Sequence, residues 1–227
     1  MTRSPGLGTA VATAVKSIFQ RDAIYRPDGV IIDGAYSRDP SNSSDVRTLL
    51  AGLLMGKITA SSKYAPAIIG VTIGAYTSGG TSLTVSAAQA VELVRRVGSS
   101  GTAALYVVGP PGAAGTVAIT ACTHSAINVT TGVLTVTSLG VNKIAGSFVC
   151  AADGTHLPRT FLPDGDGVHV VDDRTNTSID VQFPKVPAGG FIKTAQLIDY
   201  PTDTSQIGWI KAQLRAYGAW YAFDDDV

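Results

Sequence analysis

A run of aspartates and glycines is the part of this sequence that most resembles a metal site. Asp164 and Asp166 alternate with glycines, and Asp172 and Asp173 follow a few residues later. Hard cations such as Ca²⁺ bind clustered carboxylates, and an EF-hand loop begins with this alternation. The run lacks the third ligand and the closing glutamate of that loop, and a tight turn between strands explains it without a metal. We favour the turn and leave Ca²⁺ binding near Asp164 and Asp166 open.

The other residue types that do chemistry form no recognisable catalytic set. The histidines His124, His156 and His169 stand far apart in the sequence, so a metal site would need them to converge in space. The sequence has no Gly-x-Ser-x-Gly elbow, and residues 52–59 imitate a phosphate-binding loop with the wrong spacing. Cys122 and Cys150 fit small buried thiols. We therefore predict a protein that is not an enzyme and binds no cofactor.

Composition excludes several classes of function. The 227 residues carry 17 Lys and Arg against 17 Asp and Glu, so the net charge is zero. Binding to nucleic acid needs a basic excess or stripe, and no basic cluster exceeds Arg95–Arg96. With 45% hydrophobic and 15% charged residues the chain is too apolar to be disordered, yet no run approaches the roughly 18 apolar residues of a membrane span. We expect neither nucleic acid nor membrane as a partner, and a sparsely charged surface that other proteins cover.

Residue patterns predict a mainly β fold, a β-rich α+β class with one internal and one C-terminal helix. From residue 28 onward, short runs of β-branched and apolar residues alternate with Gly, Pro and Asp turns, which is typical of strands. Ser86 and Gln89 form a capping box for a helix over 86–98, in which we expect Glu92 to pair with Arg96. A second helix begins at Asp203 or Thr204 and ends at residue 218.

Two groups of apolar side chains have no assigned place in this fold. Residues 1–27 show no capped element and are interpreted as an N-terminal arm, with a disordered tail as the alternative. The arm's candidates for docking on a partner are Val11, Val15, Ile18 and Phe19. Candidates for a contact between subunits are Trp209, Trp220, Tyr221 and Phe223, because Trp and Tyr are favoured in interfaces. The alternative for this second group is the core of the same monomer.

Three segments resemble the head decoration, or capsid cement, proteins of tailed bacteriophages. In residues 50–66, Gly56 and Lys57 lie between strand-like runs, and Lys63-Tyr64 follows the turn. In residues 152–160, an Asp-Gly-Thr segment leads through Pro158 into an apolar strand. The third segment runs from Gly189 through the C-terminal helix to Asp225. The likeness covers the chain from about residue 30 onward.

The resemblance implies a β-rich homotrimer that contacts the major capsid protein, stabilises the assembled shell and catalyses nothing. It implies a place on the capsid surface of the virion, and in the host cytoplasm during assembly. Because the chain is longer than the small decoration proteins, residues 81–145 resemble a helix-plus-strand insertion into a β-rich core domain of residues 28–80 and 146–227. A tail or fibre protein that binds a host receptor is the alternative.

Overall fold

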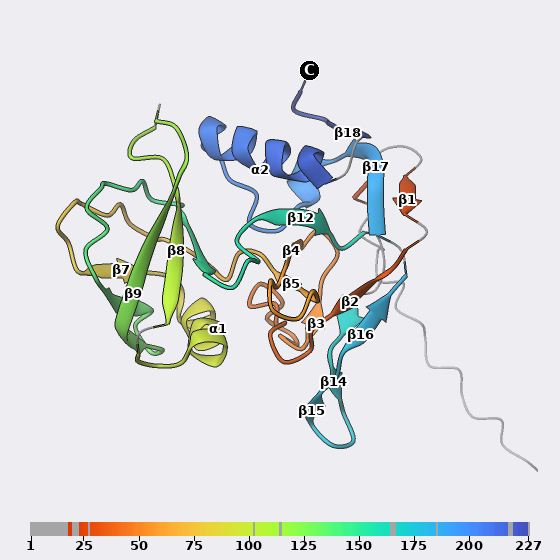
Figure 1. Ribbon diagram of the computed structural model, residues 1–227, viewed down its shortest axis with the longest axis horizontal. Helices are drawn as coiled ribbons and strands as arrows, with labels where there is room; N and C mark the ends of the chain where they lie inside the picture. Colours follow the sequence, from red (N-terminus) through yellow and green to blue (C-terminus); the bar gives the residue numbers. More distant parts are fainter. Residues whose placement is uncertain are drawn as a thin grey trace, which may run out of the picture.

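The computed structural model describes residues 18–19, 23–26, 28–101, 103–113, 115–163, 167–184, 186–217 and 220–226. In this part of the chain the fold is mainly β, with one internal and one C-terminal helix, which confirms the predicted class. Figure 1 shows two lobes side by side, with the C-terminal helix lying along the top of the molecule. Neither helix in the described part is long and apolar enough to cross a membrane.

The first lobe is built on a six-stranded sheet with the order β6-β11-β8-β9-β10-β7. Its strands are β6 (Gly70–Val71), β11 (Phe148–Ala151), β8 (Ala104–Gly109), β9 (Ala118–Asn128), β10 (Val133–Val136) and β7 (Ser82–Thr84). All neighbouring pairs are antiparallel. Residues 81–145 thus supply four adjacent strands of a sheet that β6 and β11, from the flanking parts of the chain, complete.

Helix α1 (Ala87–Val97) packs on this sheet and contacts β6, β9 and β11 (Figure 1). The predicted capping box is confirmed: the Ser86 side chain accepts the Gln89 N–H, and the Gln89 side chain accepts the Ser86 N–H. Gly98 ends the helix with a φ of +88°, and its N–H donates to the carbonyl of Val94. The positive φ explains why glycine follows the last turn.

The predicted pairing along α1 is wrong. Glu92 forms its ion pair with Arg95 at 2.6 Å, three residues on, while Arg96 turns away to Asp153 at 2.9 Å. Both Glu92 and Arg96 are buried, whereas Val91 is exposed. The charged residues lie on the packed face because the Arg96 guanidinium has partners there.

The second lobe contains a five-stranded sheet with the order β12-β4-β5-β2-β16. Its strands are β12 (Pro158–Phe161), β4 (Leu54–Lys57), β5 (Tyr64–Pro66), β2 (Val30–Ile32) and β16 (Val181–Phe183). Strands β2 and β5 are parallel, and the other pairs are antiparallel. A Cβ on Gly56 would lie 1.9 Å from the carbonyl oxygen of Thr155, so only glycine lets the residue 152–157 turn lie against β4.

Two short ladders extend from this lobe. Strand β3 (Thr48–Leu49) pairs with β13 (Val168–His169), and β14 (Val171–Asp172) pairs with β15 (Thr177–Ser178). The β14–β15 hairpin projects from the lower edge of the molecule in Figure 1. These ladders position the polar side chains of residues 37–48 and 169–178.

A three-stranded sheet closes the second lobe. Its order is β1 (Ile24–Arg26), β17 (Val186–Ile192) and β18 (Trp220–Phe223). Strand β1 is antiparallel and β18 parallel to β17. The parallel pair is joined by the 3-10 helix η1 (Thr194–Gln196) and helix α2 (Thr204–Tyr217), which is the crossover that parallel strands require. Asp203 caps α2, since its Oδ1 accepts the N–H groups of Ser205 and Gln206.

Strand β11 is shared by two hydrophobic cores. Phe148 and Cys150 belong to the core beneath α2, whereas Val149 and Ala151 belong to the core beneath α1. Successive side chains of a strand point to opposite faces, so a single strand forms a wall of both cores. A third, smaller cluster, which includes Ile32 and Met55, packs against the five-stranded sheet.

Candidate functional site

The outward face of the three-stranded sheet carries exposed apolar side chains. Ile24, Gly189 and Trp220 lie opposite one another on the three strands, and Phe191 pairs with Ala222 further along. Trp220 is 74% and Ile24 55% exposed. We call this surface, made of Ile24, Gly189, Phe191, Trp220 and Ala222, the outer sheet face.

Glycine at position 189 shapes the centre of the outer sheet face. A Cβ there would lie 2.8 Å from the Cβ of Trp220, closer than two such atoms approach. Trp220 and Ile24 lie on either side of Gly189, whose backbone is itself buried. Exposed apolar side chains such as Trp220 and Ile24 are typical of a surface that another protein covers.

Two of the four residues predicted for the subunit interface, Tyr221 and Phe223, lie on the inward face of β18. Tyr221 and Phe223 are buried, and the Tyr221 hydroxyl donates to the carbonyl of Pro187 at 2.7 Å. The prediction of an interface role is therefore wrong for these two residues, because strand alternation points them into the core. Trp220, the alternate residue, remains available at the surface.

Trp209 takes an intermediate position. It lies on α2, is half-buried, and packs against the α2 core with its ring centroid 6.4 Å from that of Phe148. The structure thus separates Trp209, on helix α2, from Trp220, which projects from the three-stranded sheet.

The N-terminal docking residues are also corrected in part. Ile18 is fully buried and Phe19 is 7% exposed, and both belong to the core beneath α2. Phe19 bridges to Ile192 on β17, and its ring lies 5.5 Å from that of Phe161. Their assignment to an arm outside the core is wrong, because β17 and α2 enclose them. Val11 and Val15 lie outside the described residues.

The acidic C-terminal residues fasten β18 to α2. Lys211 Nζ lies 2.6 Å from carboxylate oxygens of both Asp225 and Asp226, and Arg215 lies 2.6 Å from Asp226. The same two cations lie over the Phe223 ring, at 5.2 and 5.1 Å from its centroid. These contacts hold the strand that carries Trp220 in place.

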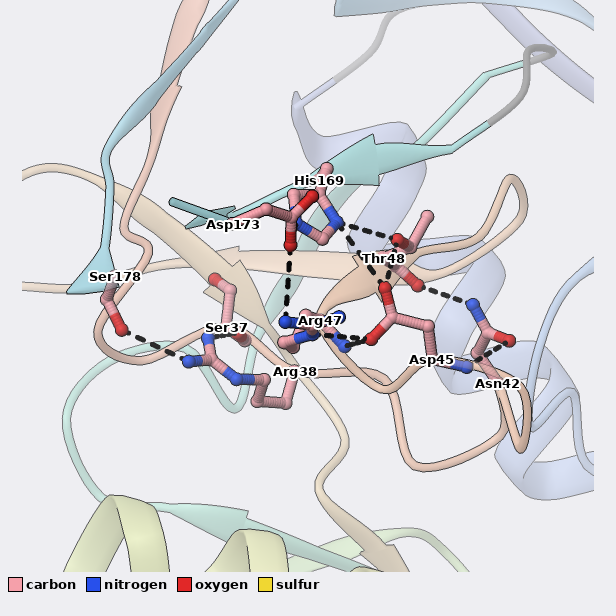
Figure 2. A network of polar contacts seen from close by, with 9 residues as sticks. All are labelled: Ser37, Arg38, Asn42, Asp45, Arg47, Thr48, His169, Asp173 and Ser178. Atoms are coloured by element: carbon pink, nitrogen blue, oxygen red, sulfur yellow. Dashed lines mark hydrogen bonds and ion pairs between the residues drawn. The ribbon is translucent and has the colours of Figure 1, made fainter. Parts of the chain in front are cut away.

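A polar network surrounds His169 (Figure 2). His169 Nδ1 lies 2.9 Å from Thr48 Oγ1 and 3.5 Å from Asp45, and Nε2 lies 3.2 Å from Asp173. Arg47 bridges the two carboxylates, at 2.8 Å from Asp45 and 3.2 Å from Asp173. We call these five residues the His169 network.

The chemistry of the His169 network follows from its contacts. A hydroxyl, an imidazole and a carboxylate in line are the parts that activate a nucleophile, but here the Thr48 hydroxyl also donates to Asp45 at 2.9 Å. The hydrogen bond from Arg47 lowers the pKa of Asp45 to about 2. The network ties the 37–48 loop to β13 and the β14–β15 hairpin. The presence of Asp173 four residues after His169 is the sequence feature that could have indicated this contact.

The aspartates considered for Ca²⁺ do not come together where the structure describes them. Asp173 belongs to the His169 network, and Asp172 caps its own turn by accepting the Arg174 N–H. Asp164 and Asp166 lie outside the described residues. Among the described residues no group of three or more His, Cys, Asp or Glu side chains is arranged to hold a metal ion.

A cleft of about 790 Å³ separates α1 from the second lobe. Arg96 lines it and donates to Asp153, to Thr155 Oγ1 at 2.6 Å and to the carbonyl of Pro66 at 2.7 Å. Asp33, on the opposite wall, accepts two backbone N–H groups. The charged groups of this cleft are thus engaged with the protein itself.

The described structure also buries the thiols of two cysteines and the amine of Lys143. Cys122 and Cys150 are free and buried, as predicted, and burial raises their pKa to about 11 and about 12. Burial lowers the pKa of Lys143 to about 8, and its Nζ donates to the carbonyls of Gly109 and Ala118, both at 2.7 Å. Lys143 thereby fastens the facing ends of β8 and β9.

Comparison with protein-family models, with curated proteins and with solved structures finds no match to this chain.

Proposed function

We propose that this chain is a structural virion protein that binds the assembled capsid shell and stabilises it, as a homotrimer in contact with the major capsid protein. The observation that carries the proposal is the outer sheet face. An exposed tryptophan on a sheet that the α2 contacts hold fixed has the properties of an interface anchor: large apolar area with little entropy to lose on binding.

The arrangement of the resembling segments adds support. Residues 50–66 and 152–160 are distant in sequence. Nevertheless, β4 pairs with β12, and the Thr155 carbonyl packs closely against Gly56. The third segment contains β17, α2 and β18, the elements that build the outer sheet face. The residues that suggested a decoration protein therefore form one continuous part of the second lobe.

We assign the outer sheet face to the contact between copies of the chain. The face carries no charge, and the chain has zero net charge, so copies meet without electrostatic repulsion. A protein that binds only the assembled shell stabilises the shell by mass action. Self-association through the outer sheet face would present several copies of the chain to the shell at once.

The test mixes purified protein with expanded capsid shells of its virus. We expect saturable binding and a higher melting temperature of the shell, measured by calorimetry at increasing protein concentration. A serum-albumin control should leave the shell unchanged. Recovery of the protein only from tails after virions are dissociated would reject the proposal in favour of a tail protein.

A further inference from the structure

A second cavity, of about 570 Å³, lies where the chain enters α2. The loop before the helix supplies Asp199, Tyr200 and Asp203 to one wall, and the first lobe supplies Val71, Ile144 and Phe148 to the other. We call this cavity the α2 pocket. It combines apolar walls and an aromatic ring with a carboxylate, the mixed lining that is typical of binding pockets.

Asp199 is the unusual residue of the α2 pocket. Its backbone has a φ of +55°, a conformation that is uncommon for residues other than glycine. No hydrogen bond or ion pair from another described residue reaches its carboxylate, whereas Asp203 accepts two N–H groups as the helix cap. Burial, together with the charge of Asp39, raises the pKa of Asp199 to about 6. The chain therefore keeps an unpaired acid at a costly position.

Nothing cationic in the described structure offsets this charge. No Lys, Arg or His is among the described residues that line the α2 pocket. The nearest cations of the helix, Lys211 and Arg215, are already held by Asp225 and Asp226. Asp39, behind Asp199, is also acidic and accepts the backbone N–H groups of Ser41 and Leu50. The α2 pocket thus has uncompensated negative charge inside apolar walls.

We propose that the α2 pocket binds a cationic side chain of a partner protein, with the Asp199 carboxylate as its counter-ion. Phe148, Val71 and Ile144 would contact the aliphatic stem, and the Tyr200 ring, which also lines the pocket, offers a cation–π partner to a lysine ammonium or arginine guanidinium. A cation supplies the attraction that Asp199 lacks in the free protein, because opposite charge favours the ionised carboxylate. The identity of the partner as the capsid shell rests on the proposed function.

Binding of the cation is tested without the shell. We would titrate the ¹⁵N-labelled full chain with n-butylammonium and with n-butylguanidinium, using n-butanol as the neutral probe, and follow amide shifts by NMR. We expect saturable shifts at residues 144–148 and 199–206 with at least one cation, and weaker binding of n-butanol. Asp199→Asn should weaken cation binding at least tenfold, whereas Asp180→Asn, in the distant β16 region, should leave it unchanged.

The outcomes separate the two proposals. Equal binding of butanol and the cations, or unchanged cation binding by Asp199→Asn, overturns the cationic pocket. If wild type binds shells, Asp199→Asn should bind them at least tenfold more weakly, and equal binding overturns the shell as the partner of this pocket. If wild type does not bind shells but the cation titration succeeds, the proposed function fails and the pocket stands.

Discussion

The guanidinium of Arg96 connects three segments that are far apart in the sequence. Its side chain is 2% exposed, and it donates to Asp153, to Thr155 and to the carbonyl of Pro66. A buried charge is tolerated only when such partners replace water. Removing the guanidinium takes away the donor of the Pro66 carbonyl and of Asp153 Oδ2, which costs more than the ion pair itself contributes.

We therefore predict that Arg96→Met lowers the free energy of unfolding by about 2–4 kcal/mol. Urea denaturation followed by circular dichroism measures the change. Arg174→Met, at an exposed turn, is the matched control and should change stability by less than about 0.5 kcal/mol. A similar small change in both variants would show that the buried network contributes little.

The free energy of unfolding depends on pH through the titration of Asp199. Its pKa is about 6 in the folded protein and 3.8 in the unfolded chain, so between these values the folded state binds the extra proton. The free energy of unfolding of the wild type therefore falls as pH rises through this window. Above it, the ionised Asp199 carboxylate destabilises the folded state fully. Asp199→Asn removes the titration, and asparagine tolerates the positive φ.

We predict that Asp199→Asn is more stable than wild type by about 1–2 kcal/mol at pH 7.5, and that the difference disappears below pH 4. Thermal unfolding across this pH range is the measurement. Asp180→Asn should act in the opposite direction, because the hydrogen bond from Lys63 lowers the pKa of Asp180. A variant that is less stable than wild type at pH 7.5 would contradict the argument.

At the scale of elements, Phe19 and strand β1 both pair with β17. Phe19 contacts Phe161, and a Cβ on Gly190 would lie 2.6 Å from the Phe19 ring, so the β17 backbone is shaped to receive it. Phe19→Ala should lower the free energy of unfolding by about 3–4 kcal/mol, measured by urea denaturation. Ile24→Ala, at the exposed side of the same segment, should cost far less, and equal losses would be inconsistent with this placement.

Local patterns predicted the elements whose signals are local. Both helices and their caps at Ser86 and Asp203 follow from short-range residue chemistry. The apolar run of residues 63–72 is divided into β5 and β6, which belong to different sheets. No pattern of alternating residues marks that division, because both halves are buried.

Strand β17 shows why the rest could not be predicted. Residues 186–190 read Val-Pro-Ala-Gly-Gly, a composition typical of a loop. They form a strand because residues 24–26 pair with one edge and residues 220–223 with the other. Which of Trp220 and Tyr221 faces solvent depends on this pairing. The sequence could therefore indicate the aromatic residues of β18 but not which of them would lie on the outer sheet face.

At the scale of the whole molecule, the shared strand β11 couples the two lobes. We predict that urea unfolds both cores in one transition. Tryptophan fluorescence reports the second lobe, and labelling of Cys122 in a Cys150→Ala variant reports the core beneath α1. The two midpoints should coincide; a midpoint for Cys122 well below that for tryptophan would show that the lobes unfold separately.

The assembly of the protein provides the test of the outer sheet face. We predict that Trp220→Ala weakens self-association at least tenfold while shifting the thermal midpoint by less than 2–4 °C, the shift expected for about 1 kcal/mol. Sedimentation gives the mass and calorimetry the midpoint. Tyr221→Phe, which loses only a buried hydroxyl, should keep the assembled mass. An intact trimer of Trp220→Ala with a strongly lowered midpoint would return Trp220 to the monomer's own stability.

The position of β17 between β1 and β18 also sets an order of events during synthesis. Residues 18–26 leave the ribosome long before β17 exists to pair with them, and the parallel partner β18 follows only after α2. Until then, Phe19 and the inward side of β17 have no completed core to enter. Pairings so distant in sequence form slowly, so Phe19 and the inward side of β17 stay exposed to other chains until residue 223 has been synthesised.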